Sequence, residues 1–196
     1  MAAAANFAWC NRQVMMHLAE RAFVQALGVG PRALGFSLVY DVCHNIAKFE
    51  EHVVDGQKRT LCVHRQGATR AFGPGNPALP ESLRELGQPV LIPGDMGRYS
   101  FVLIGLAAAM RETFGSSCHG AGRVKSRTQA KKEARGRDLY AELRGLGVTV
   151  RAQSRAGVAE EMPAAYKDVA EVVEVMEAAG VTQRVARLKP FAVIKG

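Results

Sequence analysis

Apolar positions along the chain follow two different periods, which predicts a mixture of helices and strands. Residues 2–27 and residues from Pro163 to Ala179 carry apolar side chains at helical spacing, and glycines lie just beyond both segments, where helix caps belong. A further, basic helix is predicted from Ser126, with Gln129 at the capping-box position and Gly145 near its end.

Shorter apolar runs between turn residues predict strands at 35–42, 59–66, 89–92, 100–104 and 148–151, and an extended segment at 181–196. Residues 67–80 and 93–100 are rich in glycine and proline and are predicted to be loops. Helices and strands interleave irregularly and no internal repeat is present, so the fold class we expect is α+β, within a single unit spanning residues 1–196.

Composition excludes several classes of protein. The chain has 196 residues, 48% of them hydrophobic and 22% charged, and no apolar run approaches the ~18 residues that a membrane span needs. The start of the chain lacks the basic region of a signal peptide. Four cysteines, without paired spacing, argue against a disulfide framework or a zinc ribbon. We therefore expect a reduced, cytoplasmic protein without a membrane partner.

The formal charge of +8 is concentrated in one segment. Residues 122–137 contain seven basic residues and a single acid, Glu133. Such a run is commonly a solvated helix face. Because this one begins inside a glycine-rich loop, it also indicates a polyanionic partner, with RNA or DNA as the obvious candidate.

The stretch 115–127 has the composition of a phosphate site around one histidine. His119 is followed by Gly120, Ala121 and Gly122, and then by the basic residues Arg123, Lys125 and Arg127. A neutral imidazole is a nucleophile, and glycine-rich turns let backbone N–H groups approach an anion. These residues predict histidine attack on a phosphoryl or nucleotidyl group. A glycine-rich turn around a buried structural histidine is the alternative.

Seven ordered motifs, distributed over the whole chain, resemble the C-terminal part of RtcB-type RNA-splicing ligases. They are Ala2–Trp9 with Asn11–Gln13, Tyr40–Val42 with His44–Asn45, His64–Arg65 with Gly67–Pro74, Ile92–Ser100, His119–Val124 with Ser126–Arg127, Ser154–Gly157 with Glu160–Glu161, and Val193–Gly196. The resemblance implies an α+β fold and a GTP- and Mn(II)-dependent enzyme. Such an enzyme joins an RNA 3′-phosphate or 2′,3′-cyclic phosphate to a 5′-hydroxyl through a guanylylated histidine, in tRNA splicing or RNA repair.

The resemblance also assigns roles to individual positions. It implies that His119 takes the GMP and that His44 is a manganese ligand. Nucleotide-binding positions would be Asn45, Pro93, Gly94, Asp95, Met96, Ser100, Gly120, Ala121, Gly122 and Lys195. An archease-type activator is a further partner that the family implies. We interpret His17, His52 and His64 as structural.

Two departures stand out from the family pattern. Gln66 occupies a position where lysine is common, and Lys125 one where methionine is. Family members are also longer, and the N-terminal part that is absent here contributes further metal ligands. Because Mn(II) needs several ligands, we expect the chain alone to guanylylate poorly or not at all.

Three functions therefore stay open. The first is the RNA ligase, or its catalytic C-terminal portion. The second is a truncated RNA- and GTP-binding fragment without turnover. The third is another phosphotransfer enzyme, which would form a phosphohistidine from a γ-phosphate.

Overall fold

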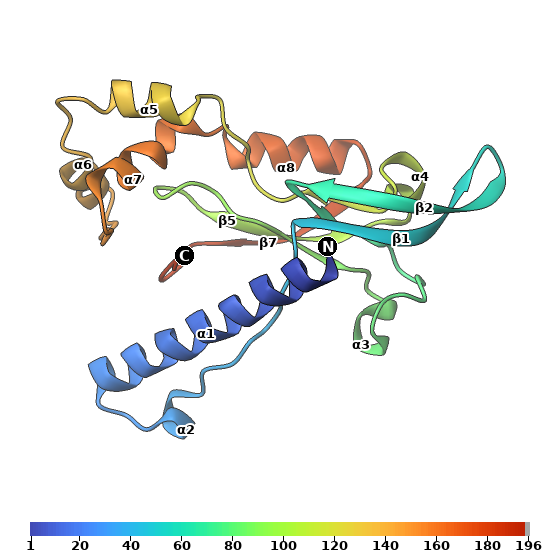
Figure 1. Ribbon diagram of the computed structural model, residues 1–196, viewed down its shortest axis with the longest axis horizontal. Helices are drawn as coiled ribbons and strands as arrows, with labels where there is room; N and C mark the ends of the chain where they lie inside the picture. The colour runs from blue at the N-terminus through green and yellow to red at the C-terminus, as the bar shows by residue number, and fades with distance from the viewer. Residues whose placement is uncertain (195–196) are drawn as a thin grey trace.

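The computed structural model describes residues 1–194, which form three small antiparallel sheets and a set of mostly short helices (Figure 1). The predicted α+β class is confirmed. Lys195, predicted to contact the nucleotide, lies outside the described residues.

The first helix, α1 (Ala2–Leu27), lies along one side of the molecule and is mostly exposed, and its Phe23 contacts Phe191 near the C-terminal end (Figure 1). The predicted bounds and the cap at Gly28, which has a φ of 65°, are confirmed. After the short α2 (Pro31–Leu34), residues 36–43 run back along α1. Arg12 donates two hydrogen bonds to Asp41, at 2.6 and 2.8 Å, and Phe23 contacts Phe36. The strand predicted at 35–42 is wrong, because this segment packs on α1 and no strand within residues 1–194 pairs with it.

A long hairpin follows, formed by β1 (Asn45–Val54) and β2 (Gln57–Gln66) in full antiparallel register. The tight turn at Asp55 and Gly56 has positive φ at both residues, 51° and 76°. The sequence analysis predicted β2 but not β1. An Asp-Gly pair between apolar runs is a recognised hairpin signal, so β1 was predictable. The loop predicted at 67–80 contains one short strand, β3 (Ala68–Arg70), which pairs with β6 (Ser116–Cys118).

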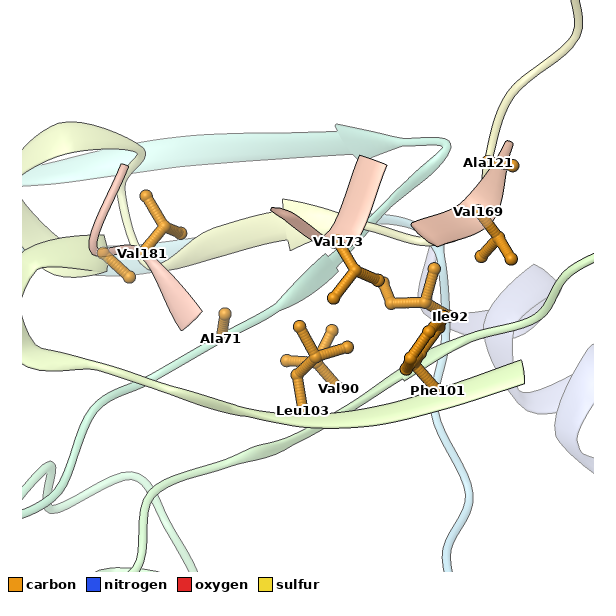
Figure 2. Close-up of a cluster of buried hydrophobic side chains, with 10 residues drawn as sticks. Ala71, Val90, Ile92, Phe101, Leu103, Ala121, Val169, Val173 and Val181 are labelled. Carbon is orange, nitrogen blue, oxygen red and sulfur yellow. The ribbon is translucent and has the colours of Figure 1, made fainter. Parts of the chain in front are cut away.

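The central sheet has the order β4 (Pro89–Ile92), β5 (Ser100–Gly105) and β7 (Thr182–Leu188). The predictions at 89–92 and 100–104 are confirmed, and the predicted extended C-terminal segment includes β7. The helix α8 (Val169–Ala178) lies over this sheet, and α3 (Glu81–Arg84) and α4 (Ala107–Glu112) flank the strands (Figure 1). Figure 2 shows the resulting core, in which Val169 and Val173 of α8 face Ile92, Phe101 and Leu103 of the sheet.

A second, smaller hydrophobic cluster lies within the helical end of the chain. It is formed by α5 (Arg127–Glu133), α6 (Leu139–Gly145), α7 (Arg155–Glu160) and the 3-10 turn η1 (Pro163–Ala165). Its fully buried members include Ala130, Met162 and Ala165.

Two helices predicted in this part of the chain have other bounds, and one predicted strand does not form. The basic helix from Ser126 ends at Glu133, because Gly136 adopts a φ of 76° and Asp138 caps a new helix. No strand forms at 148–151. The helix predicted from Pro163 is divided, because Asp168 accepts a hydrogen bond from the Ala170 N–H and starts α8.

Candidate active site

The site is centred on His119, which follows β6 directly. The imidazole ring of His44, just before β1, stacks on the His119 ring with centroids 4.7 Å apart and planes inclined by 12°. The two histidines are 75 positions apart in the sequence. The Ala68 N–H donates to the His44 carbonyl, and Ala68 pairs with Cys118, so β3 connects the two histidine-bearing segments.

Gly67 lies against the Cδ2–Nε2 edge of the His119 ring. A Cβ at this position would lie 3.3 Å from both Cδ2 and Nε2 of His119, and Gly67 has a φ of 63°. Its N–H donates a 2.9 Å hydrogen bond to Asn45 Oδ1. Asn45, predicted to bind nucleotide, therefore already uses one side-chain oxygen to hold Gly67 in place. A glycine is required here by both conformation and space.

The His119 ring is half-buried, and its pKa is lowered. Burial is the main cause, because it disfavours the charged imidazolium, and the electrostatic influence of the neighbouring His44 acts in the same direction. The ring is consequently neutral at pH 7 and keeps a nitrogen lone pair. The neighbouring Cys118 thiol has its pKa raised by burial, so it stays protonated and unreactive at neutral pH.

The backbone after His119 is held by both hydrophobic clusters. Ala121 is buried in the first cluster, beside Val169 (Figure 2). Gly122 is exposed, with a φ of 74°, and its carbonyl accepts from the Lys167 N–H. The alternative from the sequence was a glycine-rich turn around a buried structural histidine, whereas this ring is only half-buried and contacts His44 and Gly67.

The loop between β4 and β5 meets the glycine turn. A Cβ at Gly120 would lie 3.6 Å from the Pro93 carbonyl oxygen. At Gly94 a Cβ would lie only 2.2 Å from the Tyr99 carbonyl oxygen, so this position excludes any side chain. The Gly94 N–H also lies 3.4 Å from Ser100 Oγ. Pro93 thus lies beside Gly120, and Gly94 and Ser100 lie next to each other in the same loop.

Asp95 carries a buried acceptor atom in the same loop. Its Oδ1 accepts from the Gly97 N–H at 2.9 Å. Oδ2 is 3.3 Å from Arg98 Nε but has no hydrogen bond of acceptable geometry among the described residues. Met96, also predicted to bind nucleotide, packs against the second hydrophobic cluster.

The cations that follow His119 in the sequence are largely used within the protein. Arg123 donates to the Glu160 carbonyl at 2.6 Å and to the Tyr166 hydroxyl at 3.0 Å, and it lies over the Tyr166 ring. Lys125 pairs with Glu133, and Arg127 lies 3.4 Å from Glu160. The expectation of three cations with unopposed charge beside His119 is therefore too simple.

A buried ion pair between Arg65 and Glu50, which the sequence reasoning missed, contacts β6 at Ser116. Arg65, 2% exposed, forms two 2.8 Å hydrogen bonds with Glu50 across the hairpin. It also donates to Ser116 Oγ and to the Phe114 carbonyl. His52, 3% exposed, contacts the same Glu50 carboxylate, which confirms a structural role, whereas His64 is exposed on β2. Alternation along β2, with Arg65 facing the core, was the available signal.

The described residues do not form a complete metal site. No group of three or more His, Cys, Asp and Glu side chains is arranged to hold an ion in residues 1–194. His44 is exposed, and its ring makes no hydrogen bond within that range, so its nitrogens are accessible. The residues present thus fit one ligand of a manganese site and not the whole of it.

A comparison with known proteins decides the family. A sequence model described as tRNA-splicing ligase RtcB matches residues 1–196. The chain belongs to the RtcB family. It is similar to the tRNA-splicing ligases RtcB of Archaeoglobus fulgidus (56% identity), Pyrococcus abyssi (55%) and Aeropyrum pernix (48%). All of this chain is matched in each case, but it covers 41%, 21% and 40% of those proteins.

No helix in residues 1–194 combines the length and apolar character needed to cross a bilayer.

Proposed function

We propose that the chain is the C-terminal catalytic portion of an RNA ligase that uses GTP and Mn(II). It would join RNA 3′-phosphate or 2′,3′-cyclic phosphate ends to 5′-hydroxyl ends in tRNA splicing or RNA repair. Family membership supports the reaction class. The observation that carries the proposal is the convergence of His119, His44, Gly67 and the Pro93–Gly94 turn from four separate segments.

In this proposal His119 is the nucleophile. A neutral ring nitrogen forms a bond to the α-phosphorus of GTP, and pyrophosphate leaves with the electrons of the broken P–O bond. The RNA 3′-phosphate then takes the GMP from His119, and attack by the RNA 5′-hydroxyl forms the phosphodiester and releases GMP. The lowered His119 pKa supports the first step, because the ring is neutral at physiological pH.

The turns around His119 are suited to a nucleotide. Gly120 and Gly122 carry no side chains, so their backbone can approach a phosphate closely. Asp95 Oδ2, which faces Arg98 at 3.3 Å but accepts no hydrogen bond among the described residues, is an acceptor for a ribose hydroxyl or a guanine N–H. Lys195, assigned to the nucleotide base by resemblance, stays a prediction.

His44 would supply one ligand to Mn(II), an ion that neutralises charge on a reacting phosphate when it is bound. The remaining ligands would come from the part of the protein that this chain does not span. The incomplete metal site favours the second candidate function for the isolated chain, that of a fragment that binds RNA and GTP without turnover. A cytoplasmic location is supported by four free cysteines in the described residues, and an archease-type activator stays a prediction.

The test uses a chimaera in which residues 1–196 replace the matching portion of the Archaeoglobus fulgidus relative. With Mn(II), label from α-labelled GTP should become attached to this portion, and His119→Ala should abolish the attachment. Labelling from γ-labelled GTP would instead indicate a phosphohistidine enzyme. Label that persists in the His119→Ala variant would overturn the assignment of the nucleophile. The isolated chain should label far more weakly than the chimaera.

A further inference from the structure

The basic segment 122–137 does not present a uniformly positive surface. Ion pairs to acidic residues occupy five of its seven cations: Arg123–Glu161, Lys125–Glu133, Arg127–Glu160, Lys131–Glu160 and Arg137–Glu142. Within residues 1–194, Lys132 and Arg135 have no acidic partner. Paired cations attract a polyanion less strongly, so the attraction is concentrated at fewer positions than the sequence indicates.

The fold brings Arg155, from α7, close to Arg135. Arg155, the first residue of α7, has no acidic partner in the described chain, and it lines the same groove as Arg135. The groove has a volume of about 370 Å³ and lies between the C-terminal end of α5 and the start of α7. Both arginines are exposed. They are 20 positions apart and converge only because α5 and α7 pack together at one end of the molecule (Figure 1).

An aromatic ring and an apolar floor also line the groove, together with Asp138, whose Oδ1 accepts a hydrogen bond from the Ala141 N–H. Tyr140 lines it and is half-buried, with its ring packed against the second hydrophobic cluster. Leu139 and Val158 contribute buried apolar surface below. Gly136, with a φ of 76°, lets the chain turn tightly along one edge without a side chain.

These groups match the chemistry of a single-stranded nucleic acid. Guanidinium groups without a carboxylate partner form two-pronged hydrogen bonds with phosphate, and a fixed aromatic ring stacks a base of any identity. The groove volume of about 370 Å³ lies near the lower end of the range for small-ligand sites, which suits a single nucleotide. An acidic peptide would use the arginines but would have no need of the ring.

We propose that this groove holds one nucleotide of a single-stranded RNA, with Arg135 and Arg155 on its flanking phosphates and Tyr140 stacked on its base. The groove is separate from the residues around His119 and would hold the strand at a distance from its reacting end. This inference rests on the proposed function in taking RNA as the substrate.

The test measures RNA affinity without GTP or Mn(II), so its result is independent of nucleotide transfer. The probe is a fluorescent oligoadenylate of about 12 nucleotides, within the span of known single-strand sites. Binding by the 196-residue chain is followed by anisotropy over a range of salt concentrations. Thermal unfolding of every variant shows that it is folded.

The double variant Arg135→Glu/Arg155→Glu should bind about tenfold more weakly or worse, and the slope of log affinity against log salt should fall by about 1.4. The matched control is Lys58→Glu/Arg59→Glu at the tip of the β1–β2 hairpin, which changes the net charge equally and should cost less than about threefold. Equal losses in the two double variants would show that overall charge, and not the groove, attracts RNA.

Tyr140→Phe keeps the ring and should bind as the wild type does, whereas Tyr140→Leu should lose about fivefold or more. If neither the arginine pair nor Tyr140→Leu changes RNA affinity, the proposal is wrong, and a protein partner becomes the better occupant. Absence of RNA binding by the folded wild type would also overturn it. Failure of GMP transfer to His119 would leave this result untouched.

Discussion

The imidazole of His44 stacks directly on that of His119, with 4.7 Å between the ring centroids. The proposed metal ligand and the proposed nucleophile are therefore in contact, so each can be tested against the other. In the chimaera described above, His44→Phe keeps an aromatic ring in the stack but removes both nitrogens. We expect its Mn(II) affinity to fall on the order of tenfold or more, measured by titration calorimetry. His119→Phe should bind Mn(II) as the parent does, and an equal loss in both variants would remove the distinction between the two roles.

Gly67→Ala should disturb the chemistry as well as the stability. The added methyl would meet His119 Nε2 and Cδ2 at 3.3 Å, and the left-handed φ of 63° costs about 1–2 kcal/mol for a residue with a side chain. Gly56→Ala is the matched control, because its φ of 76° imposes similar strain and nothing lies within 4 Å of the new methyl. Both variants should lose similar stability in chemical denaturation, but only Gly67→Ala should lose GMP transfer. Equal transfer rates would mean that the ring has room to move.

Arg65→Met should be among the most destabilising single changes in the protein. It leaves the Glu50 carboxylate without its partner in a site where Arg65 is 2% exposed, and breaking such a buried pair costs about 3–5 kcal/mol. The double variant Arg65→Met/Glu50→Leu should recover much of the loss, because no unpaired charge remains. Arg59→Met, on an exposed part of the same strand, should change stability by less than about 0.5 kcal/mol. Urea unfolding measures all three, and a mild effect of Arg65→Met alone would contradict the burial argument.

Stability should fall in acid partly through Glu50. Burial acts to raise its pKa, but hydrogen bonds and charge from Arg65, with a contribution from His52, outweigh burial and lower it from its ordinary value of 4.5. A lowered folded-state pKa gives stability that is present above pH 4.5 and is lost as the pH falls toward the folded-state value. Glu50→Gln should therefore flatten the acid side of the curve of unfolding free energy against pH. An unchanged acid slope would show that other carboxylates account for it.

The sequence predicted the elements whose signals are local. Helix α1 with its cap at Gly28, and strands β4 and β5, follow from periodicity and turn residues. The segment 35–42 has strand-like composition, yet no partner strand reaches it, and Arg12 and Phe23 hold it along α1 instead. A strand depends on its neighbours as much as on its own residues, so this error could not be seen locally.

In the candidate site, too, the sequence predicted the features with local signals and missed those that depend on contacts between distant segments. The glycines around His119 indicated a phosphate site, and the resemblance assigned the Pro93–Gly94 turn to the nucleotide. The close approach of Pro93 to Gly120 agrees with both interpretations. The stacking of His44 on His119 depends on β3 pairing with β6, which the sequence reasoning did not predict. The charge run from 122 to 137 was visible, but which of its cations are paired with acids depends on the packing of α5 against α7.

Residues 120–125 join the two hydrophobic clusters, with Ala121 in one and Val124 hydrogen-bonded to Ala165 of the other. His119, the proposed nucleophile, thus lies beside the connection between two halves of the molecule, each with its own hydrophobic cluster. Heating should let these halves slide on one another before either melts. In the chimaera, the proposed GMP transfer would then fail at a temperature at which spectroscopy still registers a native fold.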